Sequence, residues 1–207
     1  MNASDLLEGH RVIPVVVIDN AAHALPLGKT LLDSGIRALE ITLRTEAGLS
    51  SIKTIAEKLP ELIVGAGSIR QSGQLAAAID AGAKFLVSPG STDTLLDEAT
   101  KAGLPFVPGA ATASEMMKLL ERGYRLQKFF PAEQLGGLAM INALTAPLPE
   151  VMLFPTGGIN RELAVQYLAH NRVACVGGSW FVPQALIRTG DFDSIGTLAS
   201  EAAKLQT

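Results

Sequence analysis

A single lysine, Lys128, lies between apolar and aromatic residues in the segment 127–132 (QKFFPA). An apolar environment favours the neutral form of an amine, and a neutral lysine can attack a carbonyl carbon to form a Schiff base. A lysine at a strand end can instead lay its stem along apolar surface and keep its charge in water. The choice between a nucleophile and a surface residue therefore depends on the residues expected beside it.

Polar and apolar residues alternate along positions 39–44 (LEITLR). Because side chains of a strand alternate between its two faces, Glu40, Thr42 and Arg44 share one face. The apolar face belongs against helices, and the same alternation lets Lys128 on a later strand face Glu40. A carboxylate there can relay protons, and Arg44 can bind a substrate carboxylate, which points to a keto acid. A structural ion pair is the alternative.

Two glycine pairs lie in the segments 154–160 (FPTGGIN) and 176–180 (VGGSW), each after a candidate strand. We expect both pairs to open helices, where backbone amides without side chains form a cradle for an anion. One glycine pair alone is often a plain turn. The segment 65–68 (GAGS) permits close approach of the backbone to a ligand or forms a tight turn, and Pro89-Gly90 is a weaker signal of the same kind.

Short β-branched runs alternate with stretches of helical period, which predicts parallel βαβ units. The candidate strands cover residues 12–18, 38–43, 62–66, 85–87, 105–107, 125–129, 151–154 and 173–176. The candidate helices cover residues 22–34, 49–59, 71–81, 92–102, 114–122, 135–143, 161–170 and 191–205. Eight strands predict an α/β protein with a closed (β/α)₈ TIM barrel, whose active site lies where the strands end. An open doubly wound sheet would carry a glycine-rich turn after the first strand, where residues 18–20 (IDN) offer none.

The composition narrows the classes of partner. A chain of 207 residues, 48% hydrophobic and 18% charged, predicts one domain over residues 1–207. A net charge of −3 and 5% aromatic residues argue against a nucleic-acid surface. The first residues lack the pattern of a secretory signal, and no apolar run has the length of a membrane span. We expect a cytoplasmic protein with a small-molecule partner, no nucleic acid and no membrane.

The histidines and the cysteine give no sign of metal chemistry. His10, His23 and His170 are scattered without the spacing of metal ligands. Cys175 has no second cysteine to pair with, and its neighbours Ala174 and Val176 predict a packed position in the core. We therefore expect no catalytic metal and no cofactor.

Seven segments, taken together and in order, resemble the family of 2-keto-3-deoxy-6-phosphogluconate (KDPG) aldolase, which also acts on 4-hydroxy-2-oxoglutarate (KHG). They are residues 40–45 (EITLRT), 64–67 (VGAG), 87–90 (VSPG), 108–115 (Pro108-Gly109, Thr112 and Ser114-Glu115), 128–133 (KFFPAE), 155–159 (PTGGI) and 177–180 (GGSW). The resemblance covers nearly the whole chain, and the lysine and double-glycine segments are its most specific parts.

The resemblance implies a metal-free class I aldolase that forms a homotrimer of (β/α)₈ barrels. The implied reaction cleaves KDPG to pyruvate and glyceraldehyde 3-phosphate, a step of the Entner-Doudoroff pathway, with KHG as a candidate second substrate that gives pyruvate and glyoxylate. By the resemblance, Lys128 is the Schiff-base lysine and Glu40 is the general acid and base. The implied substrate-binding residues are Arg44 and Ser68 for the pyruvate carboxylate, Pro89 and Phe130 for the pyruvyl end, and Thr156, Gly157, Gly158, Gly178 and Ser179 for the distal part with its phosphate.

The chain departs from the family pattern at two places. Ser68 stands where the family commonly has threonine, so the hydroxyl is kept and a methyl group is lost. Some relatives carry a basic residue near the end of the first strand, where this chain has residues 18–20 (IDN). Phosphate binding would then depend on backbone amides and hydroxyls.

Two other functions suit a phosphate-binding barrel. An epimerase or a phosphate-linked synthase would need no lysine in an aromatic strand, and metal dependence would favour it. A regulatory barrel that only binds a phosphorylated metabolite predicts binding without borohydride trapping. Lys128 serves only the aldolase reaction.

Overall fold

The computed structural model describes residues 3–205, so residues 1–2 and 206–207 of the predicted domain lie outside it. The strands are β1 (Val12–Val16), β2 (Ala38–Thr42), β3 (Ile63–Gly67), β4 (Phe85–Val87), β5 (Phe106–Val107), β6 (Leu126–Phe129), β7 (Met152–Pro155) and β8 (Val176–Gly178). The helices are α1 (Ala3–Leu7), α2 (Ala24–Asp33) after a 3₁₀ turn (Ala21–His23), α3 (Ala47–Lys58), α4 (Ser72–Asp80), α5 (Asp93–Ala102), α6 (Ala113–Glu121), α7 (Gly137–Thr145), α8 (Arg161–Leu168), α9 (Gln184–Thr189) and α10 (Phe192–Ala203).

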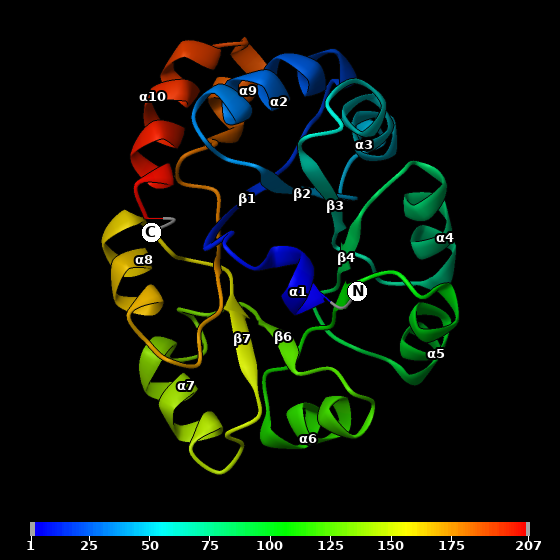
Figure 1. Ribbon diagram of the computed structural model, residues 1–207, viewed down its shortest axis with the longest axis vertical. Coiled ribbons are helices and arrows are strands. Elements are labelled where there is room, and N and C mark those ends of the chain that lie inside the picture. Colours follow the sequence, from blue (N-terminus) through cyan, green and yellow to red (C-terminus); the bar gives the residue numbers. More distant parts are fainter. Residues whose placement is uncertain (1–2, 206–207) are drawn as a thin grey trace.

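The strands form a curled, parallel arrangement that the larger helices surround (Figure 1). Six strands pair in the order β5-β4-β3-β2-β1-β8, and β6 pairs with β7 in a second sheet. Isolated parallel bridges, Gly109 with Lys128 and Thr156 with Gly177 among them, lie between the two sheets. The fold is therefore α/β with a mostly parallel curled sheet, and the continuous eight-stranded ladder that we expected is interrupted at β5–β6 and β7–β8.

The prolines around β5 account for one interruption. Pro105 and Pro108 flank its two residues, and proline has no N–H with which to extend a ladder. The carbonyl of Pro108 still accepts a hydrogen bond from the Lys128 N–H at 2.9 Å. Contact between β5 and β6 therefore continues without a regular ladder.

The core has two parts because side chains alternate along each strand. Leu39 and Ile41 of β2 belong to the larger cluster with the surrounding helices, as we predicted for the apolar face. The second cluster, the inner cluster, contains α1 residues and side chains from the opposite faces of the strands. Its buried members are Ala3, Leu7, Ile13, Ala38, Phe85, Val87, Val107, Leu126, Phe154 and Cys175.

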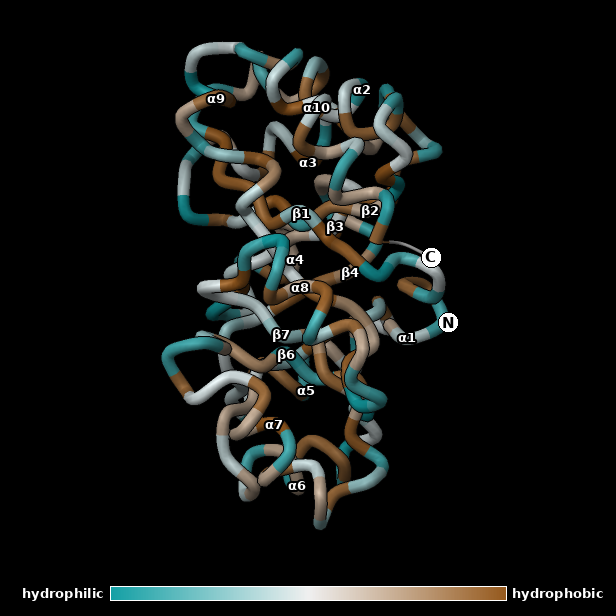
Figure 2. The backbone as a smooth tube through the Cα atoms, turned by 90° about the vertical axis from the view of Figure 1, so that its left-hand side faces the viewer, coloured by the Kyte–Doolittle hydropathy of each residue, from teal (hydrophilic) through white to brown (hydrophobic). Residues whose placement is uncertain are grey.

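Two short helices, α1 and α9, were not expected from the sequence. They lie on opposite sides of the strands (Figure 2). The α1 helix contributes Ala3 and Leu7 to the inner cluster. None of the helices within residues 3–205 is long and apolar enough to cross a membrane.

The strand β8 begins later than we predicted, at Val176 instead of position 173. Gly177 and Gly178 consequently lie within a strand and do not open a helix, which corrects our expectation for this pair. A Cβ on Gly177 would lie 2.3 Å from Thr156 Oγ1, so these glycines permit close packing of β7 and β8. The other pair, Gly157-Gly158, does precede a helix, α8.

Candidate active site

Lys128 and Glu40 meet in the interior, although they come from strands β6 and β2. The Lys128 Nζ lies 3.1 Å from Glu40 Oε1 and 3.4 Å from Oε2. Lys128 is 4% exposed and Glu40 is fully buried. Nζ also lies 5.6 Å from the centre of the Phe130 ring and 5.9 Å from that of Phe154. A carboxylate and an amine in such a dry site depend on each other, because removing either leaves the other unpaired.

The glycines of β3 make room for this pair. A Cβ on Gly67 would lie 1.9 Å from Glu40 Oε1, and a Cβ on Gly65 would lie 2.3 Å from the Phe85 ring. Because β2 pairs with β3 in register, Glu40 stands opposite Gly65. Gly67 therefore leaves the space that the Glu40 carboxylate occupies, and Gly65 leaves the space for the Phe85 ring.

Arg44, Ser68 and Pro89 come together where β2, β3 and β4 end. Arg44 Nε donates a hydrogen bond to Ser68 Oγ at 3.1 Å. With Leu43 and Arg70 these three residues line a cavity of about 310 Å³. Ser68 has a φ of 59°, in the left-handed region where a β-branched residue is strained. Arg70 adds a second guanidinium that our sequence analysis did not consider.

A larger cleft of about 500 Å³ adjoins Arg44. Its other lining residues are Val15, Val17, Phe130, Thr156, Gly157, Gly158, Ile159, Gly177, Ser179, Trp180, Val182, Pro183 and Gln184. Most of the predicted distal-site residues are present, but Gly177 takes the place expected for Gly178. A Cβ on Gly178 would lie 1.7 Å from the Trp180 ring. The alternation along β8 explains the difference, since only one residue of the pair can face the cleft.

The end of β7 presents groups suited to an anion. The Thr156 Oγ1 is buried and has no hydrogen-bond partner among the described residues. Gly157 and Gly158 follow with φ of 105° and 77°, which favour glycine. The Asn160 side chain then accepts a hydrogen bond from Leu163 N at 2.8 Å and caps α8. An unpaired hydroxyl and a bare glycine turn before a capped helix suit an anionic ligand.

Asp19, near the end of β1, binds Gln184 and Arg188 at the rim of the larger cleft. Arg188 Nε donates to Asp19 Oδ2 at 2.6 Å, and Gln184 Nε2 donates to the same oxygen at 3.0 Å. The hydrogen bonds from Arg188 and then from Gln184 lower the pKa of Asp19. Both donors belong to α9, which we did not predict. A basic residue is thus present near the end of the first strand, but it is paired with a carboxylate.

Two further observations concern alternative chemistry. Between residues 3 and 205, no cluster of three or more histidine, cysteine, aspartate or glutamate side chains is arranged to hold a metal ion. Cys175 is buried as predicted, and desolvation raises the pKa of its thiol. A buried thiol of this kind is a poor nucleophile.

Comparison with known proteins gives one consistent result. The family model for KDPG and KHG aldolase matches residues 4–198. The 2-dehydro-3-deoxy-phosphogluconate aldolase of Pseudoalteromonas atlantica is 44% identical over 98% of this chain and 94% of its own. The KHG/KDPG aldolase of Escherichia coli is 43% identical over 98% of this chain and 95% of its own. The crystal structure of KDPG aldolase from Legionella pneumophila, with pyruvate captured at low pH as a covalent carbinolamine intermediate, has a TM-score of 0.94 and 39% identity over 97% of each chain.

Proposed function

This chain belongs to the KDPG and KHG aldolase family, and from that premise we propose that its buried Lys128–Glu40 pair carries out Schiff-base cleavage. The protein is an aldehyde-lyase that cleaves KDPG to pyruvate and glyceraldehyde 3-phosphate. KHG, which yields pyruvate and glyoxylate, is the second substrate proposed. The observation that carries the catalytic assignment is the 3.1 Å contact between Lys128 Nζ and Glu40 Oε1 in the interior.

The reaction begins when Lys128 loses a proton to Glu40 and its Nζ attacks the keto carbon. One proton of the attacking nitrogen then moves to the former keto oxygen, which gives the carbinolamine. Glu40 returns the proton it holds to the carbinolamine hydroxyl, which leaves as water and gives an iminium ion on Lys128. The iminium then accepts electrons from the adjoining carbon–carbon bond.

Cleavage follows at the bond between the α-carbon and the carbon that bears the hydroxyl. Glu40, directly or through a water molecule, takes the hydroxyl proton, the bond breaks, and the aldehyde leaves. The electron pair remains as an enamine on Lys128. Protonation of its carbon and addition of water release pyruvate and restore the free lysine.

The remaining residues position the substrate. In this proposal Arg44 and Ser68 bind the pyruvate carboxylate, because their side chains are hydrogen-bonded beside the smaller cavity. Pro89 and Phe130 enclose the pyruvyl group. The distal phosphate lies in the larger cleft, where its contacts are the lining residues Thr156, Gly157, Gly158, Gly177 and Ser179. Gly178, which the resemblance implied for this end, is the next residue of β8 and does not line the cleft.

We further propose that the two sheets act as one closed (β/α)₈ barrel in a single domain over residues 1–207. The parallel bridges between β5 and β6 and between β7 and β8 support closure. A cytoplasmic homotrimer is the assembly proposed for this barrel, by the resemblance to the family. Native mass spectrometry would test the trimer.

The direct test of the Schiff base is mass spectrometry after incubation with pyruvate and sodium borohydride, followed by peptide mapping. We expect a reduced pyruvyl adduct on Lys128 in the wild-type protein. Lys128→Ala should lose both the adduct and turnover. Lys101, which is exposed on α5 and paired with Glu98, provides the control, and Lys101→Ala should keep both. A folded wild-type protein without an adduct would contradict the proposal.

A further inference from the structure

Glu133 and Tyr167 form a partly buried contact behind the glycine turn of the larger cleft. The Tyr167 hydroxyl on α8 donates a hydrogen bond to Glu133 Oε1. Tyr167 is fully buried. Desolvation, and then the Glu133 carboxylate, raise the pKa of the Tyr167 hydroxyl. The phenol therefore stays protonated and remains a donor to this carboxylate.

The Glu133 side chain packs directly against the turn. A Cβ on Gly158 would lie 2.7 Å from Glu133 Cβ, and a Cβ on Gly137 would lie 2.9 Å from Glu133 Oε1. The Glu133 N–H also donates to the Gly157 carbonyl at 3.2 Å. The stem of Glu133 thus packs against Gly158, while its carboxylate lies beside Gly137 and Tyr167. Because the carboxylate is held at one end, the stem limits where Gly157 and Gly158 can lie.

Neither side chain lines the larger cleft. Glu133 and Tyr167 instead line a separate cavity of about 320 Å³ with residues of α7 and α8. Gly158 lines the larger cleft, and Glu133 packs against it from behind. A contact placed in this way acts on a ligand only through the turn.

We propose that Glu133 and Tyr167 are positioning residues that set the geometry of the Gly157-Gly158 turn and thereby the affinity for the distal anion of the substrate. The inference rests on the proposed function, in which this turn receives the phosphate. Glu133 follows the strand that carries Lys128 by only a few residues, so the contact is also joined to Lys128 through the chain. The contact nevertheless acts on the distal end, since Lys128 is held by its own partner, Glu40.

The first variant to test is Tyr167→Phe, which removes only the hydroxyl. Loss of a hydrogen bond to a charged group corresponds to about a tenfold change or more in an equilibrium constant. We expect the KM for KDPG to rise by about that factor while kcat changes little. The KM for the unphosphorylated 2-keto-3-deoxygluconate and the trapping of pyruvate on Lys128 should stay unchanged.

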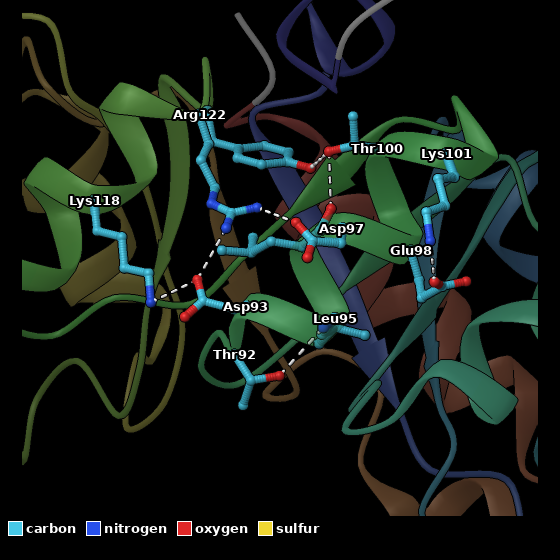
Figure 3. Close-up of polar contacts among 11 residues, drawn as sticks. Thr92, Asp93, Leu95, Asp97, Glu98, Thr100, Lys101, Lys118 and Arg122 are labelled. Carbon is cyan, nitrogen blue, oxygen red and sulfur yellow. Dashed lines mark hydrogen bonds and ion pairs between the residues drawn. The ribbon is translucent and has the colours of Figure 1, made fainter.

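The chain offers a matched control in Tyr124, its other tyrosine. The Tyr124 hydroxyl lies 3.3 Å from Thr100 Oγ1, on the outer surface where Arg122 pairs with Asp93 and Asp97 (Figure 3). Tyr124→Phe should leave all kinetic constants unchanged. Glu133→Gln keeps an acceptor for Tyr167 and should retain most of the affinity, whereas Glu133→Ala should resemble Tyr167→Phe.

Calorimetric binding of inorganic phosphate separates this inference from the proposed function. We expect the dissociation constant of phosphate to rise in Tyr167→Phe and Glu133→Ala but not in Tyr124→Phe. An unchanged phosphate affinity and KM in both variants would overturn the positioning role. Equal losses for phosphorylated and unphosphorylated substrates would also overturn it, because they would indicate general loosening. A wild-type protein that binds phosphate but never traps pyruvate would refute the Schiff-base assignment alone.

Discussion

The Glu40 carboxylate occupies space that a side chain at position 67 would fill, and Gly67 leaves that space open. A Cβ at position 67 would stand 1.9 Å from Glu40 Oε1, so Gly67→Ala must displace the carboxylate. Displacing a catalytic group by about 1 Å costs on the order of a hundredfold in rate. We expect a loss of kcat for KDPG of about that size, measured by the release of pyruvate.

Gly73 provides the control for Gly67→Ala. It lies in α4, and a Cβ on it meets no heavy atom within 4 Å. Gly73→Ala should therefore leave kcat unchanged. A Gly67→Ala variant with normal turnover would show that the carboxylate need not stay beside Lys128.

The backbone of Ser68 is strained, and its hydroxyl binds Arg44, so a substitution can separate the effect on stability from the effect on pyruvate binding. Its φ of 59° is unfavourable for a residue with a side chain, by about 1 kcal/mol. Ser68→Gly relieves that cost but adds backbone entropy of similar size to the unfolded state. We expect the free energy of unfolding to change by less than about 1 kcal/mol, as measured by urea denaturation.

The same variant should weaken pyruvate binding, because Arg44 loses the hydroxyl that orients it at 3.1 Å. The measurement is the pyruvate concentration that gives half-maximal borohydride trapping. An unchanged concentration would mean that Arg44 is oriented without Ser68. A large decrease in the free energy of unfolding would instead show that the Ser68 hydroxyl stabilises the fold.

At the scale of single elements, the last helix depends on a titratable cap. The Asp191 carboxylate accepts hydrogen bonds from Ser194 N at 3.1 Å and from Ser194 Oγ at 2.7 Å. These bonds lower the pKa of Asp191 below its ordinary value of 3.8. A lowered pKa in the folded state means that this stabilisation is complete above the ordinary pKa and is lost as the pH falls through the lowered one.

Asp191→Asn tests this cap, because asparagine caps a helix about as well as aspartate and does not titrate. We expect the wild-type protein to lose stability relative to the variant as the pH falls below about 4. Urea denaturation at a series of pH values measures the difference. A constant difference across this range would show that the charge of Asp191 contributes nothing to the cap.

The elements that the sequence predicts well are those with a strong periodic pattern. The strand at Phe85–Val87 is as predicted, and the alternation along β2 correctly places Leu39 and Ile41 against the helices. The same alternation predicts that Lys128 faces Glu40, because a period of two needs no tertiary information. Periodicity therefore suffices for most of the fold and for the contact between Lys128 and Glu40.

The short elements could not be predicted in this way. The six residues of α9 are too few to show a helical period, and α9 brings Gln184 and Arg188 to the rim of the cleft. The predicted start of β8 was wrong by three positions. Of the two glycines of this strand, Gly177 lines the cleft, whereas the resemblance implied Gly178. Local composition does not reveal which glycine of a pair lines a cleft, because that depends on the strand register.

At the scale of the whole molecule, the candidate site lies at one end of the strands, and α1 packs on their other side. The carboxyl ends carry Arg44, Ser68 and the glycine turn of the candidate site. The inner cluster instead includes Ala3 and Leu7 of α1, on the other side of the strands from α9. In (β/α)₈ barrels, the fold that we propose for this chain, one end holds the chemistry and the other contributes stability. Stability and activity should therefore respond separately to changes at the two ends.

Leu7→Ala tests this separation. Leu7 is 5% exposed and packs with the inner cluster, so truncation removes buried apolar contact and leaves a cavity. Comparable Leu→Ala changes cost about 2–5 kcal/mol, and we expect the lower part of that range because the short α1 can adjust. Leu6, only partly buried against the same cluster, provides the control, and Leu6→Ala should cost less.

The activity of the Leu7→Ala protein decides the question. At a temperature where the variant is fully folded, kcat and KM for KDPG should equal those of the wild type, because no residue of the candidate site lies in α1. Thermal inactivation should shift to a lower temperature. A lowered kcat in folded Leu7→Ala protein would show that packing around α1 reaches Lys128 and Glu40 through the interior, and the two ends would then form one cooperative unit.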